Sequence, residues 1–446
     1  MADNFSRKLD KFFLTFLIIN PFLDVISGVY IKVLETLSEK SFDTISIPVT
    51  PSLLIRMAVL VLFALYAIIT IDKKALATAI PVGIAWALSV AGEILFFYSF
   101  NLYTDIQYIA RFAYNLAVVL IYMAVFRRMG VSREQLLKRL QDVLCFSLLL
   151  LSATIVISYL FGLGYTTYAD RYGYRGTRGF FYSGNDITAI LMAGLPVVMC
   201  SFMQLKDFTP KKYIQYNLSS ALTVICLMLI GTKTAFISVI VTVAVLAACG
   251  VWRLIAQKDK TLLMRLAVIM LSVLIIFGLI AVFASESIFS EIRTSFMSTS
   301  NTAEREGAAT ALLSGRQVKL KRAFTMFKDG GVFTYLFGVG RGTQSAIIEM
   351  DIFEVVLYYG IVGAVLMLWL YISLGLGFVI NFFKNLGMLK ADLMPMACLV
   401  SLALCAGYML IAGHILFSVT SGFYFSYMLL FGKVIYTKDA AKLAIF

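Results

Sequence analysis

Residues 286–351 read ESIFSEIRTSFMSTSNTAEREGAATALLSGRQVKLKRAFTMFKDGGVFTYLFGVGRGTQSAIIEMD, and this stretch decides how the rest of the chain is interpreted. It carries eight Lys/Arg and seven Asp/Glu, whereas the sequence on either side consists of long apolar runs. Charged side chains at this density are too costly to bury in the hydrocarbon core of a bilayer. We therefore expect residues 286–351 to form a large loop outside the membrane, inserted between two blocks of spanning helices.

The composition outside this loop indicates a membrane protein. Of the 446 residues, 61% are hydrophobic and 14% are charged, and the mean hydropathy is +0.89. Soluble domains have about 25% charged residues. We predict an all-α polytopic membrane protein in which residues 1–446 form a single membrane domain. The net charge of +13 fits the Lys/Arg excess of cytoplasmic loops and gives no reason to expect a nucleic-acid partner.

The cysteines and the histidine predict neither a metal site nor a disulfide framework. All six cysteines lie in apolar runs without a CxxC spacing, and His414 is the one histidine of the chain. Buried cysteines of this kind behave as small hydrophobic residues. We expect no metal and no cofactor.

Twelve apolar runs are long enough to span a bilayer, which needs about 20 residues. They lie near 12–30, 51–71, 76–99, 104–126, 141–164, 185–204, 214–231, 234–252, 263–285, 352–380, 393–412 and 415–435. With the N-terminus inside, the cytoplasmic connections hold 22 Lys/Arg and the short outer ones hold six. This bias predicts cytoplasmic termini and places 286–351 outside, between the ninth and tenth spans.

One part of the large loop has helical periodicity. In GRQVKLKRAFTMFKDGG (315–331), Leu320, Phe324 and Phe327 are spaced i, i+4 and i+7. Ser314 is positioned to cap the start, and Gly330 and Gly331 to end the helix. The pattern predicts an amphipathic helix with a basic face that lies on the membrane surface.

Four ionisable residues lie well inside predicted spans: Asp24, Arg56, Glu93 and Arg111. Each is five to seven residues from the outer end of its span, so all four share a level roughly 8–11 Å below the outer surface. Two explanations remain open. The residues form two ion pairs that join the first four helices, or Arg56 or Arg111 has spare charge for a lipid phosphate.

The second outer loop combines aromatic and cationic side chains. Between Tyr165 and Tyr182 it contains seven aromatics together with Arg171, Arg175 and Arg178. Aromatic rings stack on sugar faces and guanidinium groups bind phosphates. An interfacial aromatic belt is the alternative explanation for the tyrosines.

Five motifs follow one another in order: RGTRGFFYSGNDIT (175–188), GTKTA (231–235), SGR (314–316), FGVGRGT (337–343) and EMDIFEVVLYYGIVG (349–363). Their order and spacing over about residues 165–365 resemble the O-antigen ligase and Wzy-type polysaccharide polymerase superfamily. The GVGRGT run looks like a phosphate loop but lacks the lysine of a Walker motif, and a hinge or turn better explains its glycines.

The resemblance implies a membrane glycosyltransferase of the C-type (GT-C) architecture in the bacterial cytoplasmic membrane, with its active site facing outward. The donor and acceptor would be glycans linked to undecaprenyl diphosphate, and a flippase and a chain-length regulator would be further partners. By resemblance Arg316 and Arg178, or Arg175, bind the diphosphate. The remaining diphosphate candidates are Arg111, Arg56 and Arg341.

One departure from the family pattern bears on the activity. Ligases of this family carry a His-Asn pair where this chain has Glu349-Met350-Asp351. The difference favours a polymerase, with Glu349 or Asp351 as the base for the acceptor hydroxyl. We expect a single displacement that inverts the anomeric carbon, and metal independence because the sequence shows no metal cluster. The alternative role for both acids is to cap the helix that follows. An O-antigen-ligase-like transfer to another acceptor and a transporter of lipid-linked glycan remain the competing functions.

Overall fold

The computed structural model describes residues 2–38, 50–70, 73–97, 101–167, 176–205, 209–283, 304, 307, 310, 313–341, 348–437 and 443. Arg171 and Arg175, and most of 286–312, lie outside the described residues, so the predictions for them stay predictions.

The described chain is almost entirely helical. Its helices before the large loop are α1 (Ala2–Ser38), α2 (Pro51–Ile69), α3 (Lys73–Gly92), a π-helical turn (Glu93–Phe97), α4 (Leu102–Arg128), α5 (Arg133–Leu160), α6 (Gly184–Met203), α7 (Pro210–Ile230), α8 (Lys233–Gln257) and α9 (Thr261–Phe283). The remaining helices are α12 (Arg316–Asp329), α13 (Gly331–Phe337), α14 (Asp351–Lys384), a 3-10 helix (Leu386–Lys390), α15 (Met394–Ile411) and α16 (Ser421–Tyr436). Two short antiparallel strands, β1 (Tyr165–Thr166) and β2 (Thr177–Gly179), form the one sheet of the described residues.

Eleven helices of the described chain are long and apolar enough to cross a membrane. They match the first eleven predicted segments, so the prediction of an all-α multi-pass membrane protein is confirmed. The twelfth segment, 415–435, forms the 16-residue helix α16, which begins only at Ser421. At 1.5 Å per residue α16 is about 24 Å long. It starts late because the backbone N–H groups of residues 414–416 donate to the Asp351 carboxylate instead of entering a helix.

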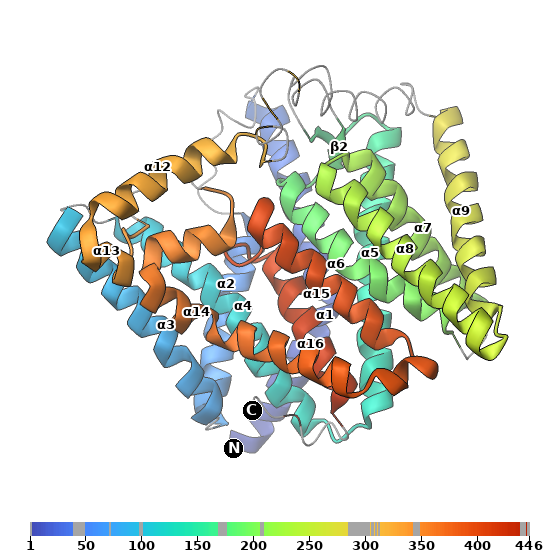
Figure 1. Cartoon of the computed structure of the whole chain (residues 1–446), viewed down its shortest axis with the longest axis horizontal. Coiled ribbons are helices and arrows are strands. Elements are labelled where there is room, and N and C mark those ends of the chain that lie inside the picture. The colour runs from blue at the N-terminus through green and yellow to red at the C-terminus, as the bar shows by residue number, and fades with distance from the viewer. Residues whose placement is uncertain are drawn as a thin grey trace.

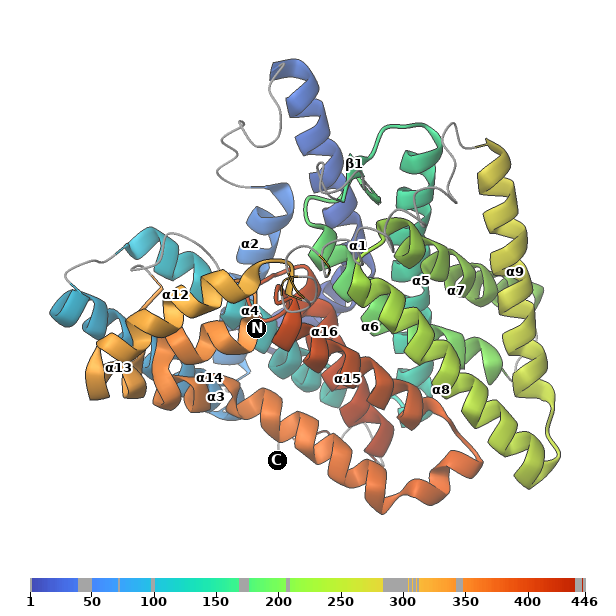
Figure 2. The ribbon, with the colours of Figure 1, turned by 45° about the horizontal axis from the view of Figure 1, so that its top comes forward.

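Helix α6 lies at the centre of the bundle. It contacts α5, α7, α8, α15 and α16. In its most apolar 18-residue stretch 94% of the residues are buried, whereas the corresponding share for α9, at the edge of the bundle, is 17%. Helices α3, α12, α13 and the first part of α14 gather on the opposite side from α5 to α9, and the rest of α14 runs across toward α15 and α16 (Figure 1; Figure 2 shows the same grouping after a rotation).

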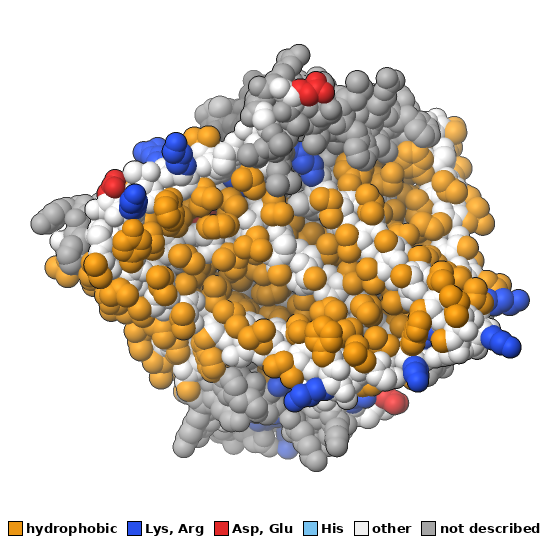
Figure 3. All heavy atoms as spheres, in the orientation of Figure 1, with side chains coloured by type: hydrophobic (Ala, Val, Ile, Leu, Met, Phe, Trp, Pro, Cys, Tyr) orange, Lys and Arg blue, Asp and Glu red, His pale blue; other side chains and the backbone are white. Residues whose placement is uncertain are grey.

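The surface has the charge distribution of a protein embedded in a bilayer. Figure 3 shows a broad hydrophobic belt between two rims that carry Lys and Arg. The N- and C-terminal ends lie at one end of the bundle, and β2 and α12 lie at the other (Figure 1). Which end faces the cytoplasm remains a prediction from the Lys/Arg bias.

Helix α14 is broken near its start, and the FGVGR segment fills the break. Gly360 has φ 68° and ψ −177°, which are not helical angles. The carbonyl groups of Leu357 and Tyr358 accept hydrogen bonds from Val339 N (2.9 Å) and Gly340 N (3.0 Å). The break leaves these carbonyl groups without a helical partner, and N–H groups of the loop donate hydrogen bonds to them instead. Backbone polar groups at membrane depth need such internal partners. Gly338 and Gly340, the described glycines of GVGRGT, therefore form a turn, as expected from the sequence.

We predict that Gly340→Ala destabilises the protein far more than Gly331→Ala. Both glycines have left-handed backbones, with φ of 75° and 72°. A Cβ on Gly340 would overlap the Glu93 side chain, whereas nothing lies within 4 Å of one on Gly331. Left-handed strain alone costs about 1–2 kcal/mol, so Gly331→Ala isolates that cost. Thermal unfolding of the two variants in detergent tests the difference, and equal melting temperatures would contradict it.

The predicted helix of the large loop is α12, with one correction. The cap is not Ser314: the N-cap is Gly315, and no side chain bonds the first turn. Phe327 is buried and Leu320 is partly buried, while Phe324 is exposed. The helix therefore packs one apolar face inward and exposes Phe324 beside its basic side chains. Its position on a membrane surface remains a prediction.

Candidate functional site

Arg56 and Asp24 form a buried ion pair between α1 and α2. Arg56 Nη1 lies 2.7 Å from Asp24 Oδ1, and Nη2 donates to Asp24 Oδ2 at 2.8 Å. Asn20 Oδ1 accepts from Nε and Nη2 (3.0 and 2.9 Å), and Thr420 Oγ1 accepts from Nη1 at 2.8 Å. Each nitrogen of this fully buried guanidinium has a protein partner, so the site leaves Arg56 no free donor for a phosphate.

The second pair, Glu93 with Arg111, is not formed. Glu93 instead lies in the π-helical turn, close to Asp105 and to the backbone of Gly340. Arg111 is partly buried in α4 and has no ion pair or hydrogen bond with any described residue. A partly exposed arginine in a spanning helix that has no partner among the described residues is a functional candidate by default.

Arg341 is buried among aromatic rings. Its guanidinium carbon lies 4.9 Å from the centre of the Tyr108 ring and 5.5 Å from that of Tyr358. Tyr108 also hydrogen-bonds the buried carboxyl group of Glu354. Arg341 is only 6% exposed, which favours a structural role that holds the FGVGR turn between α4 and α14.

Arg178 lies on β2 beside the start of α6. Its guanidinium carbon is 5.5 Å from the centre of the Tyr165 ring, and Lys32 Nζ lies 4.6 Å from the centre of the same ring. A Cβ on Gly184 would come within 3.7 Å of Arg178 Cδ. One cation from α1 and one from β2 therefore lie over an aromatic ring of β1, at the end of the bundle where α12 also lies (Figure 1).

Arg316, Lys319 and Glu349 form the charge cluster of the large loop. Arg316 Nη2 lies 3.1 Å from Glu349 Oε2, and Lys319 Nζ lies 2.9 Å from Oε1. The side chains of Arg316, Lys319 and Glu349 are 12%, 42% and 30% exposed. Two cations one helical turn apart on α12 thus contact one accessible carboxylate. The structure therefore brings together Arg316 and Glu349, two of the site residues expected from the sequence.

The two cations determine the ionisation of Glu349. Burial by itself raises the pKa of this carboxyl group, but the hydrogen bond from Lys319 and the charges of Arg316 and Lys319 outweigh it, so the pKa is lowered from its usual value. The Glu349 carboxylate is therefore ionised at neutral pH.

Residues in and beside this charge cluster have strained backbone conformations. Four described residues other than glycine have a positive φ, and three of them lie here: Ser314 (53°), Glu349 (66°) and His414 (65°). Such conformations cost about 1–3 kcal/mol each and concentrate at functional sites. The segment that carries His414 reaches Glu349, because a Cβ on Gly413 would collide with the Glu349 backbone. The site therefore includes the single histidine of the chain.

Asp351 is enclosed by backbone. Its carboxylate accepts hydrogen bonds from the N–H groups of His414 (2.9 Å), Ile415 (2.6 Å) and Leu416 (2.9 Å), and it is 1% exposed. The same region holds Glu354, whose Oε1 accepts from Glu349 N at 2.8 Å. These two acids fix the positions of His414 and Glu349.

Sequence reasoning did not single out Asp105, Asp186 or Glu354. Each is an acid inside a spanning helix, which is itself a signal for a functional or structural site. The spacing of polar residues in the sequence also indicates the Arg56–Asp24 pair. Asn20 and Asp24 are spaced i, i+4, as are Ser52 and Arg56, so each helix presents one polar face.

The arrangement combines groups suited to group transfer. Clustered cationic side chains can stabilise an anionic leaving group, and an ionised carboxylate can accept a proton. Among the described residues no group of three or more His, Cys, Asp or Glu could hold a metal ion.

Comparison with known proteins adds one finding. A model of the family described as "O-antigen ligase like membrane protein" matches residues 6–307 and 298–438, which is nearly the whole chain. No curated protein matches the chain.

Proposed function

The chain belongs to the O-antigen ligase-like family of membrane proteins, and from this premise we propose that it is a polysaccharide polymerase. The family suggests glycan transfer in a membrane. The proposal adds the substrates, which are glycan repeat units on undecaprenyl diphosphate, and the outer face of the bacterial cytoplasmic membrane as the place of reaction.

One observation carries the proposal: Arg316 and Lys319 hold Glu349 in an accessible cluster where the backbones of Glu349 and His414 are strained. A diphosphate needs concentrated positive charge, and a guanidinium fork fits its oxygens. Arg178 and Arg111 are further diphosphate-binding candidates, because neither is as enclosed as Arg56 and Arg341.

The reaction we propose is a single displacement with inversion. The acceptor hydroxyl oxygen attacks the anomeric carbon of the donor, the bond from that carbon to the diphosphate oxygen breaks, and its electron pair leaves with the diphosphate. Arg316 stabilises the charge that develops there. The hydroxyl proton goes to the Glu349 carboxylate.

Binding of the diphosphate would itself prepare Glu349 as a base. The diphosphate competes for Arg316 and Lys319, and a partly buried carboxylate that loses its cationic partners has a higher pKa. Glu349 is the better base candidate than Asp351, whose oxygens are occupied by three backbone N–H groups. In this scheme Asp351 positions the 414–416 backbone.

The choice of a polymerase over a ligase rests on Glu349-Met350-Asp351 in place of the His-Asn pair. The product separates the two functions. We expect lipids extracted from cells with the protein to contain ladders of repeat units on the carrier, and cells without it to contain single units only. Glycan found on a different anchor, with no ladder, would identify a ligase.

A further inference from the structure

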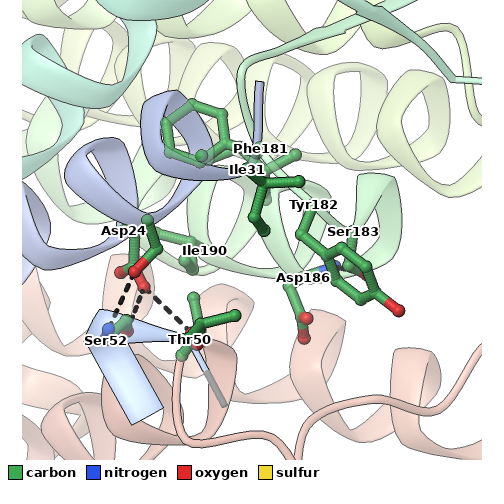
Figure 4. A pocket seen from close by; sticks show the side chains of 13 residues that line it. Asp24, Ile31, Thr50, Ser52, Phe181, Tyr182, Ser183, Asp186 and Ile190 are labelled. Carbon is green, nitrogen blue, oxygen red and sulfur yellow. Dashed lines mark hydrogen bonds between the residues drawn. The ribbon is translucent and has the colours of Figure 1, made fainter. Parts of the chain in front are cut away.

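A small cleft opens where α1, α2, α6 and α16 meet. Its volume is about 110 Å³, well below the 300–1,000 Å³ of sites that enclose whole small molecules. The cleft therefore admits one end of a larger ligand. Figure 4 shows Asp24 and Asp186 on its two sides, with Tyr182 and Phe181 beside them.

The lining is acidic and rich in hydroxyl groups. Asp24 and Asp186 are the charged members of the described lining, which contains no Lys or Arg. The hydroxyl groups come from the residues Ser27, Thr50, Ser52, Tyr182, Ser183 and Thr420. Arg56 neutralises Asp24, so Asp186 is the one acid of the described lining without an ion pair, and its carboxylate would repel an anion. We therefore expect the diphosphate to bind elsewhere.

Asp186 has free hydrogen-bonding capacity. Its Oδ1 accepts from Ser421 Oγ at 2.8 Å, and among the described residues its Oδ2 has no partner. Both Asp24 oxygens are by contrast engaged by Arg56. A carboxylate oxygen beside several hydroxyl groups accepts hydrogen bonds from alcohols, and the rings of Phe181 and Tyr182 offer apolar faces.

The cleft is connected to the charge cluster of the large loop. Ser421 Oγ, which donates to Asp186, also lies within hydrogen-bonding distance of the His414 carbonyl oxygen. Gly413, the neighbour of His414, packs against the Glu349 backbone. A ligand in the cleft would thus lie next to the residues that position Glu349.

We propose that this cleft binds an uncharged, hydroxyl-bearing sugar residue of the glycan, with Asp186 as its main acceptor. This inference rests on the proposed function, and it divides the substrate between two places. The sugar binds in the acidic cleft, and the diphosphate binds to the arginines.

The test compares two probes on purified protein in nanodiscs. One is a short-chain polyprenyl diphosphate that bears a neutral disaccharide, and the other is the same polyprenyl diphosphate without sugar. We expect Asp186→Asn to weaken binding of the glycan-bearing probe at least about tenfold and to leave the bare probe unaffected. Ile190 also lines the cleft, so Ile190→Phe should narrow it while keeping both Asp186 and Ser421, and the same pattern is expected.

Equal affinity of these variants and the wild type for the glycan-bearing probe would overturn the proposal, as would an equal loss for both probes. Arg316→Ala separates this outcome from failure of the proposed function. That variant should lose affinity for both probes. If it bound both normally, the diphosphate site would be wrong whatever the cleft variants did.

Discussion

Replacement of Arg316 by alanine is expected to reduce glycan transfer by about 10²–10³-fold, the usual cost of removing one preorganised group that stabilises developing negative charge. Arg316 is the most enclosed cation on the Glu349 carboxylate, at 12% exposure, so water replaces its charge poorly. Arg316→Lys keeps the charge but loses the planar fork, and it should restore only part of the activity. Product formation by purified protein measures both variants.

The matched control for this prediction is Arg322→Ala. Arg322 lies on the same helix α12, is exposed, and has no ion pair or hydrogen bond with a described residue. The net-charge change is the same in both variants, so a general electrostatic effect would reduce their activities equally. Full activity in Arg316→Ala would refute the assignment of the leaving-group site.

The second large effect concerns Glu349. If its carboxylate accepts the acceptor proton, Glu349→Gln should reduce the rate by about 10²–10⁴-fold, the usual contribution of a general base. Binding of the carrier-linked donor should survive, because Arg316 and Lys319 remain. A donor-binding loss that accounts for the whole fall in rate would show that Glu349 acts only as a structural anchor.

The pH dependence gives an independent test of the same residue. A carboxyl group with a lowered pKa stays ionised as the pH falls, so kcat/KM should persist below the usual range of glutamate and decline only at lower pH. Lys319→Met removes one of the groups that lower this pKa. The acid limb of the profile should therefore move to higher pH.

Lys321→Met is the control for the pH experiment. Lys321 is exposed on α12 and makes no ion pair or hydrogen bond through its side chain with a described residue. Its removal should leave the acid limb in place. An identical shift in both variants would mean that the net charge of the helix, and not contact with Glu349, sets the profile.

The sequence predicted those features of the fold that the bilayer itself requires, namely the spanning helices and the pairing of a buried charge. A span needs a long apolar run, so eleven of the twelve predicted segments coincide with helices long enough to cross a membrane, and the twelfth contains the shorter α16. Of the two explanations for the shared depth of Asp24 and Arg56, the ion pair is the one that the structure shows. The start of α16 was predicted too early because a distant carboxylate, Asp351, takes the N–H groups of residues 414–416. Local periodicity carries no information about such a bond.

Two other features depend on tertiary geometry. Glu93 faces Asp105 and Gly340 rather than Arg111 because a π-helical turn changes the direction of its side chain. His414 reaches Glu349 because the irregular connection between α15 and α16 folds over the start of α14. Neither the π-turn nor this connection has a signature in the spacing of apolar residues.

The most direct measurement places purified protein alone in liposomes with carrier-linked repeat units and follows both the size and the sidedness of the glycan. The account predicts longer glycans on the carrier in the wild type and about 10²–10³-fold slower formation of them in Arg316→Ala. If the wild type moved unchanged substrate across the bilayer and formed no new glycosidic bond, the protein would be a transporter and the account would be contradicted.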